Sequence, residues 1–402
     1  MSTGIYAGNL QRTGEYQTRG LRTLQGVRWS FQTQEHIHFP PLVAHGMVYV
    51  GSNDGCFYAL GTHTGVPQWR FETECASLPT EEYLRMDNLE HTGITSVQLT
   101  ESTAFFGTAS GIIYGLDLET GQPTWRFVGE EPEEEEEIDP TGIFHMIVAG
   151  DLLLFWSKSG LSAVDVTTKE RLWLKEGLSP FTDESLIDSL TDCPTVADQM
   201  LYGITTFFYM NSNDPGAMLY AYDISTQAWV WDDISLYNPE QMDARGYGHC
   251  ATGVIPVANG TAYFVAWTPE DEGPTCLVAV DARTGTLQWS FALEQDGGYG
   301  GYTALANNIA YVVKESGNVF AIDLTTHEAR WTRQLKGFEY APPSLADGIL
   351  YLPRYDGLIT ALDALTGQDL WTVQLDGVIT TPCTIADGVV YVAASTTVYA
   401  LH

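Results

Sequence analysis

Residues 358–371 read LITALDALTGQDLW, and variants of this stretch recur along the chain at intervals of about 50 residues. Each copy has a short apolar strand, a turn of the form Asp-x-x-Thr-Gly, and a second strand that carries a Trp. Six further copies each end at a Trp: CFYALGTHTGVPQW (56–69), IIYGLDLETGQPTW (112–125), GLSAVDVTTKERLW (160–173), LYAYDISTQAWVW (219–231), CLVAVDARTGTLQW (276–289) and NVFAIDLTTHEARW (318–331).

The residue types of the repeat each have a physical role. The Asp can accept hydrogen bonds from the amides of its turn, and the Gly four places later can adopt a positive φ. The Trp buries a large ring against the neighbouring unit. Gly61 replaces the Asp in one copy, and Lys169, Gln227 and His327 replace the Gly in three others. We expect looser hairpins in those copies.

The two ends of the chain each carry part of a repeat. Residues 26–33 contain Trp29 without the preceding strands, and residues 383–402 form three strands without a Trp strand. Together they complete one unit and cover the free edge of the last sheet. The sequence therefore predicts a single all-β domain over residues 1–402. This domain is an eight-bladed β-propeller of four-stranded antiparallel blades, closed by the N-terminal strand, which completes the last blade.

The repeat resembles that of the PQQ-binding-like (quinoprotein-type, BamB-like) β-propeller family over essentially the whole chain. The opening AGNLQRTGEY (7–16) is also similar to the start of many bacterial members. The resemblance implies the propeller fold and either a protein-interaction scaffold, as in BamB, or quinone-dependent alcohol oxidation. The quinone enzymes carry an adjacent-cysteine disulfide, a calcium site and a stacking Trp. The cysteines here lie apart, so bound PQQ is not expected: Cys56, Cys75, Cys193, Cys250, Cys276 and Cys383.

The charge balance restricts the partners. The chain has 402 residues, with 18 Lys plus Arg against 51 Asp plus Glu, and a formal net charge of −33. Such a surface repels nucleic acid and anionic membranes, and it favours a monomer. The first residues lack the signal and the lipid-attachment cysteine of a lipoprotein such as BamB. We therefore expect a cytoplasmic protein with free thiols, or a periplasmic one if a leader was removed.

The extra length of the longer repeats falls on one predicted face of the blades. Turns between first and second strands are short and share a face with the Asp-x-x-Thr-Gly turns. The insertions belong to the opposite face, where loops carry function on a rigid scaffold: 70–94, 126–141, 174–190, 203–217, 232–248 and 267–275. The acidic run EEPEEEEEIDP (130–140) in one of them indicates a solvated loop or a docking patch for a basic partner.

Strand ends on this elaborated face supply the predicted site residues. Lys158, at the end of a second strand, is also predicted to lie on this face. We assign acid/base roles to His38, Asp192, His249 and Tyr340. We assign ligand contacts to His36, His91, Arg245, Tyr247, Tyr299, Tyr302, Lys314, Glu339 and Arg354.

These residues favour a soluble propeller that binds a small organic anion. If the protein is an enzyme, we expect these side chains to transfer protons without a cofactor. The scaffold implied by the resemblance is the alternative. A metal site at His36, His38, His91 and His249 is a weaker hypothesis, because no zinc-type spacing is present. A PQQ-dependent oxidoreductase is weaker still. The same side chains can also do no more than solvate a channel, so the cofactor stays unassigned.

Overall fold

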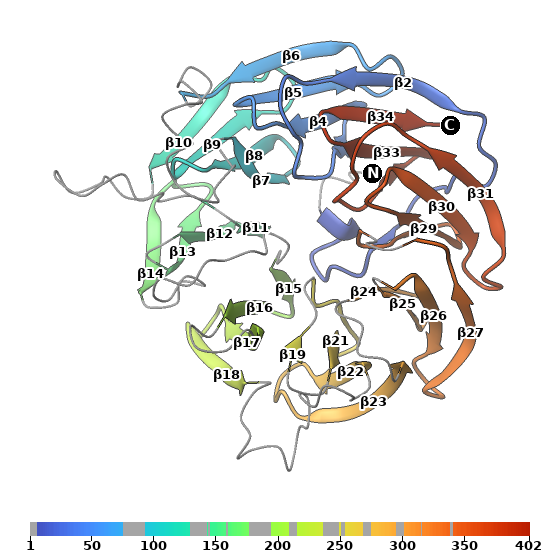
Figure 1. Cartoon of the computed structure of the whole chain (residues 1–402). Coiled ribbons are helices and arrows are strands. Elements are labelled where there is room, and N and C mark those ends of the chain that lie inside the picture. The colour runs from blue at the N-terminus through green and yellow to red at the C-terminus, as the bar shows by residue number, and fades with distance from the viewer. Residues whose placement is uncertain are drawn as a thin grey trace. The chain divides into compact units, whose positions relative to one another are not determined.

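The computed structural model describes residues 6–74, 93–128, 143, 145–157, 160–176, 194–208, 215–235, 249–250, 254–267, 275–294, 301–314, 316–337 and 341–402. These residues are almost entirely β, with one short helical turn, η1 (Tyr6–Gly8). The strands form eight sheets, each built on four antiparallel strands (Figure 1). The predicted fold class, an eight-bladed β-propeller, is confirmed. No helix in the described ranges is long and apolar enough to cross a membrane.

The chain divides into two compact units with four blades each. Unit 1 comprises Met1–Tyr6, Thr23–Thr182 and Leu375–His402. The strands of each blade are given from the inner to the outer one. Blade 1 consists of β3 (Leu42–Ala44), β4 (Met47–Gly51), β5 (Cys56–Gly61) and β6 (Pro67–Glu72), and blade 2 consists of β7 (Ile94–Leu99), β8 (Thr103–Thr108), β9 (Ile112–Asp117) and β10 (Pro123–Val128). Blade 3 consists of β11 (His145–Ala149), β12 (Leu152–Ser157), β13 (Gly160–Asp165) and β14 (Arg171–Glu176), and blade 8 consists of β32 (Thr384–Ala386), β33 (Val389–Ala394), β34 (Thr397–Leu401) and β2 (Val27–Gln32).

Unit 2 comprises Ala7–Arg22 and Asp183–Gln374. Blade 4 consists of β15 (Thr195–Ala197), β16 (Met200–Phe208), β17 (Pro215–Asp223) and β18 (Ala228–Ser235). Blade 5 consists of the two short inner strands β19 (His249–Cys250) and β20 (Val257–Ala258), which both pair with β21 (Thr261–Trp267), followed by β22 (Thr275–Asp281) and β23 (Leu287–Glu294). Blade 6 consists of β24 (Gly301–Ala306), β25 (Ile309–Lys314), β26 (Asn318–Asp323) and β27 (Glu328–Gln334), and blade 7 consists of β28 (Ser344–Ala346), β29 (Ile349–Pro353), β30 (Leu358–Asp363) and β31 (Asp369–Gln374). A short strand, β1 (Glu15–Tyr16), adds to blade 7 in parallel.

The position of a strand in its blade explains its hydrophobic pattern. The second strand β25 (IAYVVK) is buried along its whole length, because blades 5 and 7 pack against its two faces. Outer strands such as β2 (VRWSFQ) mix buried and exposed residues. The core lies between blades: Leu345 and Leu352 of blade 7 pack with Val313 of blade 6.

The N-terminal strand completes blade 8 as predicted. β2 pairs antiparallel with β34, with Trp29 opposite Ala400 and Gln32 opposite Thr397. The His402 amide extends the ladder by donating to the Gly26 carbonyl at 3.0 Å. The first and last strands of the repeat array therefore share one sheet within unit 1.

In blades 1 to 7, the two kinds of tight turn lie at the same end of the blade. The amide after the repeat Asp, or after Gly61 in its place, donates to the carbonyl of the first turn, as from Thr62 to Gly46 at 3.1 Å and from Ala364 to Gly348 at 2.9 Å. Two of the three hairpins without Gly are not looser. Lys169 (φ 67°) and His327 (φ 57°) take the positive φ of the missing Gly, and their amides make the same 2.8 Å turn bond.

Candidate functional site

Much of the predicted site lies outside the described residues. This holds for Lys158 and for seven of the assigned residues: His91, Asp192, Arg245, Tyr247, Tyr299, Glu339 and Tyr340. For His249, the structure gives the backbone in β19, where it pairs with Trp267 of β21. The predicted residues that can be placed with their side chains are therefore His36 and His38 in unit 1, and Tyr302, Lys314 and Arg354 in unit 2.

His36 and His38 form a stacked pair. Their ring centroids lie 5.9 Å apart with an interplanar angle of 28°, and both side chains are exposed. Ile37 between them is 3% exposed, and its amide donates to the Ser395 carbonyl at 2.9 Å. Burial of the middle residue of His-x-His thus turns both imidazoles outward together. Among the described residues, no three His, Cys, Asp or Glu side chains gather into a possible metal site.

Lys314 is buried at the end of β25. Its side chain is completely enclosed, and its Nζ donates to the hydroxyl of Thr275 at 3.2 Å. The register places Lys314 opposite Gly301, and the half-buried Tyr302 opposite Val313. The structure therefore joins Lys314 to a neighbouring blade of unit 2 through a hydroxyl.

Arg354 forms a bidentate ion pair. Its Nε donates to Oδ1 of Asp356 at 2.6 Å and its Nη2 donates to Oδ2 at 2.5 Å. Its Nη1 donates to the Lys336 carbonyl of blade 6. The hydrogen bonds from Arg354 lower the pKa of Asp356. An external anion would have to displace this carboxylate, so the guanidinium predicted as an anion anchor already holds an internal one.

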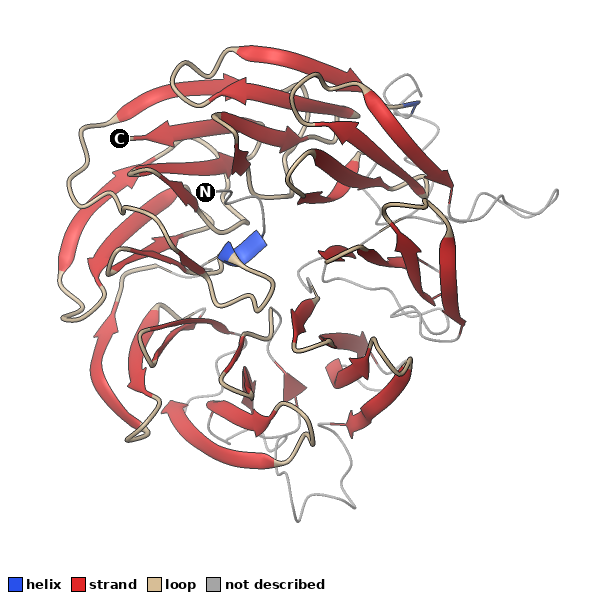
Figure 2. Ribbon diagram, turned by 180° about the vertical axis from the view of Figure 1, so that it is seen from behind, coloured by secondary structure: helices blue, strands red, loops and turns tan. Residues whose placement is uncertain are grey.

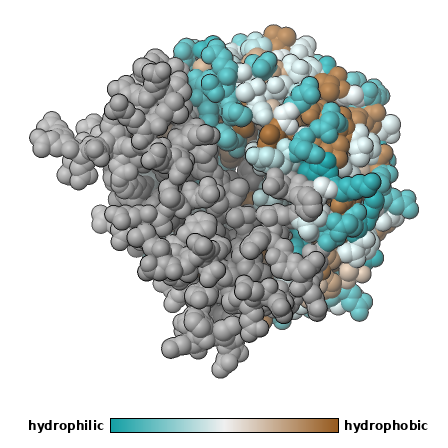
Figure 3. Space-filling model, in the orientation of Figure 1, coloured by the Kyte–Doolittle hydropathy of each residue, from teal (hydrophilic) through white to brown (hydrophobic). Residues whose placement is uncertain are grey.

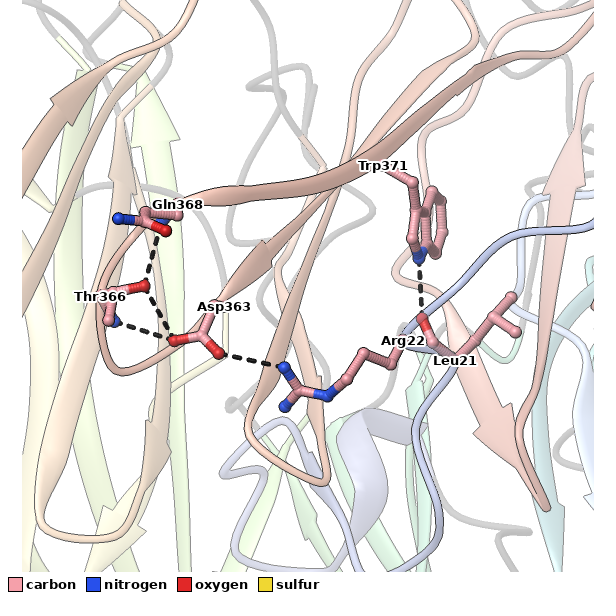
Figure 4. Close-up of polar contacts among 6 residues, drawn as sticks. All are labelled: Leu21, Arg22, Asp363, Thr366, Gln368 and Trp371. Carbon is pink, nitrogen blue, oxygen red and sulfur yellow. Dashed lines mark hydrogen bonds and ion pairs between the residues drawn. The ribbon is translucent and has the colours of Figure 1, made fainter.

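Residues 7–22, which we call the N-terminal segment, have a structural role that the repeat pattern did not predict. At its end, the Leu21 carbonyl accepts a hydrogen bond from Nε1 of Trp371 at 2.7 Å (Figure 4). The Leu21 amide donates to the hydroxyl of Tyr351 at 2.6 Å. Nη1 of Arg22 lies 3.2 Å from Oδ2 of Asp363. The other oxygen of this carboxylate, Oδ1, accepts hydrogen bonds from the amide and the hydroxyl of Thr366 in the repeat turn (Figure 4).

This anchor has a structural logic. In several other blades, the Trp donates to the carbonyl that follows the first turn residue of the next blade, as from Trp331 to Ala364 at 3.0 Å and from Trp231 to Ala282 at 3.1 Å. Blade 8 has no Asp-x-x-Thr-Gly turn, and Trp371 bonds to Leu21 instead. The N-terminal segment supplies the missing acceptor. Three arginines in the first 22 residues of a chain with 18 basic residues were the available signal.

Apolar groups on the visible described surface are scattered. In Figure 3, brown hydrophobic residues alternate with teal hydrophilic ones. The large exposed apolar side chains include Val66 and Leu365 in the repeat turns and Leu172 on an outer strand. Single apolar residues of this kind are normal on a protein surface and do not mark a site.

Comparison with known proteins gives the family. The sequence profile of the family described as "Outer membrane protein assembly factor BamB" matches residues 24–233 and 275–402. The chain is 25% identical over 212 residues to the outer membrane protein assembly factor BamB of Burkholderia pseudomallei (strain K96243). This alignment covers 52% of the chain and 48% of the relative, so the chain spans about half the length of the curated relative it matches.

Solved structures of two functional classes share the fold. BamB from Moraxella catarrhalis superposes with a TM-score of 0.62 and 16% identity, over 94% of this chain and 97% of that one. A europium-containing methanol dehydrogenase gives 0.68 and 15%, over 98% and 89%. The quinohemoprotein alcohol dehydrogenase from Comamonas testosteroni gives 0.69 and 14%, over 100% and 80%. At these identities the likeness shows the fold alone.

Proposed function

The chain belongs to the family described as outer membrane protein assembly factor BamB, and on this premise we propose that it is a protein-interaction scaffold. The observation that carries the proposal is the profile match, which includes strands of all eight blades. In the scaffold, tightly bonded blades hold the loops of the elaborated face in place for a partner. The partner is a protein.

The placed polar residues support a scaffold more than a catalytic centre. Arg354 is engaged by Asp356, and Lys314 is enclosed beside Thr275. A site for acid/base chemistry needs its groups within hydrogen-bond reach of a substrate. These two cations instead join strands and blades of unit 2.

Charge suggests the chemistry of the partner. With 51 acidic and 18 basic residues, the carboxylates of this chain outnumber its Lys and Arg side chains by 33. Several of the arginines are already paired, as Arg126 is with Glu74 at 3.0 Å. We therefore propose a partner with a basic surface, because complementary potentials speed association and suppress wrong partners. The description of the family favours the periplasmic location over the cytoplasmic one.

A small-molecule function is the second candidate, and the stacked His36–His38 pair is the observation that favours it. Two exposed imidazoles on one side of a chain can accept and donate protons to a bound anion. Native mass spectrometry of the freshly purified protein tests this candidate. Retention of a small molecule that is lost in a His36→Ala/His38→Ala variant supports it, and the bare mass of the chain in both samples counts against it.

The scaffold is tested by purification and rebinding. Proteins crosslinked to the chain in cells of its source are identified, expressed separately and titrated against the purified chain at increasing salt. We expect direct binding that weakens as salt rises, because exposed charges are screened. A variant with Gln in place of each Glu in 130–137 tests whether the acidic run contributes to binding. The control variant carries Glu119→Gln and Glu170→Gln, which lie in the repeat turns of the opposite face. If no purified candidate binds the chain at low salt, the scaffold function is wrong.

A further inference from the structure

The N-terminal segment follows the innermost strands of all four blades of unit 2. Figure 2 shows the blue η1 turn and the tan chain after it beside these strands. Four of its carbonyls each accept a hydrogen bond from a different blade. The acceptor and donor residues are Leu10 and Val196 at 2.9 Å, Gln11 and Val257 at 3.0 Å, Thr13 and Leu305 at 2.6 Å, and Gly14 and Leu345 at 2.8 Å. The donors lie on inner edge strands, so the segment covers the inner edge of each blade in unit 2.

Pairing with blade 7 continues as a regular ladder. β1 runs parallel to β28, with Glu15 opposite Leu345 and Tyr16 opposite Ala346. The segment bends before this strand, because Arg12 has φ 54° and Gly14 has φ 75°. Because of this bend, carbonyls that are close together in the sequence reach separate blades. A straight strand would instead pair along the edge of a single sheet.

Alternate side chains of the segment are buried. Arg12 is 1% exposed and its Nε donates to the Pro194 carbonyl at 3.0 Å. Tyr16 is 2% exposed. Between them, a Cβ on Gly14 would lie 2.8 Å from Cβ of Ala304 and 3.2 Å from the Pro343 carbonyl oxygen. The inner edge of unit 2 thus fits Arg at one position, excludes a side chain two residues later, and encloses a phenol ring two residues after that.

Charge also favours this pairing. The N-terminal segment has Arg12, Arg19 and Arg22 against the single acid Glu15, in a chain of net charge −33. A basic segment is attracted to the rest of such a chain even before it docks. Backbone pairing supplies affinity and side-chain pockets supply specificity, as in other cases where a peptide adds to a sheet edge.

We propose that the inner edge of unit 2 is a peptide-binding groove that recognises Arg-x-Gly-x-Tyr, and that its ligand is the N-terminal segment of this chain. The segment comes from the chain itself in the structure. The groove uses contacts of β15, β20, β24 and β28 rather than the loops of the elaborated face. Its test needs no partner protein and is separate from the test of the scaffold.

The experiment uses a fluorescent peptide of residues 7–22 and two forms of the full chain. In Gly14→Val, the new side chain would clash with Ala304 of blade 6, and we expect the resident segment to leave the groove. We expect the wild-type peptide to bind this variant and to bind the wild-type chain at least about tenfold more weakly, because the tethered segment competes at high effective concentration. A peptide with Gly14→Val should bind neither form, and a peptide with Gln11→Ala, changed at an exposed side chain, should match the wild-type peptide.

Each outcome decides the question. Failure of the wild-type peptide to bind a folded Gly14→Val chain overturns the groove, and so does equal binding of the Gly14→Val peptide. If the Gly14→Val chain does not fold, the wild-type peptide is added during refolding. Recovery of folded protein then supports the groove, and no recovery with the wild-type peptide overturns it.

Discussion

Replacing Gly367 with Ala tests how the blades are held together. Gly367 lies in the Asp-x-x-Thr-Gly turn of blade 7 at φ 69°, and a Cβ there would lie 2.8 Å from Cδ2 and 2.9 Å from Cε3 of Trp331 in blade 6. Gly348 is the matched control in the same blade. It has φ 70°, and a Cβ there meets nothing within 4 Å.

The two substitutions separate backbone strain from contact with the Trp. Both place Ala at a positive φ, which costs about 1–2 kcal/mol. Only Gly367→Ala also overpacks a ring, at about 1–3 kcal/mol. Blade 6 shows how such a contact relaxes, because His327 occupies the same position and stacks on Trp289 with ring centroids 4.4 Å apart. We therefore expect Gly367→Ala to be the more destabilising by about 2 kcal/mol.

Thermal unfolding measures this difference. For a chain of 402 residues, 2 kcal/mol corresponds to a melting temperature about 2 °C lower than that of Gly348→Ala. Unit 1 offers an independent repeat: a Cβ at Gly65 would lie 2.6 Å from Trp29, whereas one at Gly46 meets nothing. Equal melting temperatures within both pairs would show that positive φ alone requires Gly in these turns, and the role assigned to the Trp would be wrong.

Three further changes test single contacts. Arg330→Ala should raise the pKa of Asp323 from about 2 toward its ordinary value near 4, because it removes hydrogen bonds of 3.0 and 2.6 Å to Oδ2; carboxyl NMR shifts measure this pKa. Because folding lowers the pKa of Asp323, the ionised carboxylate stabilises the folded state fully above about pH 4, and this stabilisation is lost as the pH falls toward 2. The melting temperatures of the wild type and Arg330→Ala should therefore differ above about pH 4 and become equal near pH 2. Trp371→Phe removes the donor to the Leu21 carbonyl and should cost about 1 kcal/mol in urea unfolding, with faster amide exchange in residues 20–22. Tyr351→Phe leaves the buried Leu21 amide without its acceptor and should cost about 1–3 kcal/mol; no change in the urea midpoint would refute this contact.

The repeat predicted the fold because its residues act locally. Asp117 accepts from the amide and hydroxyl of Thr120 within a single turn, and Trp69 reaches the next repeat at Leu118. Spacing along the chain is enough to identify such contacts. The prediction of looser hairpins was wrong for Lys169 and His327, which adopt the positive φ of the missing Gly. The turn bond there outweighs the strain of a positive φ in a residue with a side chain.

The candidate site was less predictable because partners distant in sequence decide what a side chain does. Arg354 points to Asp356 in its own hairpin and to Lys336 in the preceding blade, and strand position alone did not reveal this pairing. Arg12 bonds to Pro194, 182 residues away. No periodic pattern marks the N-terminal segment, since its path follows four blades rather than one. The local signs were its basic composition and the similarity of residues 7–16 to the start of other family members, and neither reveals that path.

The pairing of β2 with β34 also sets the timing of biogenesis. Trp29 leaves the ribosome early, and its cross-strand neighbour Ala400 is translated about 370 residues later. At elongation speeds of about 5–20 residues per second, the early strand waits roughly 20 to 75 s before its partner strand is translated. Blade 8 can therefore form only after residues 397–401 have been translated, and messages truncated before the codons for these residues would yield chains that cannot complete it.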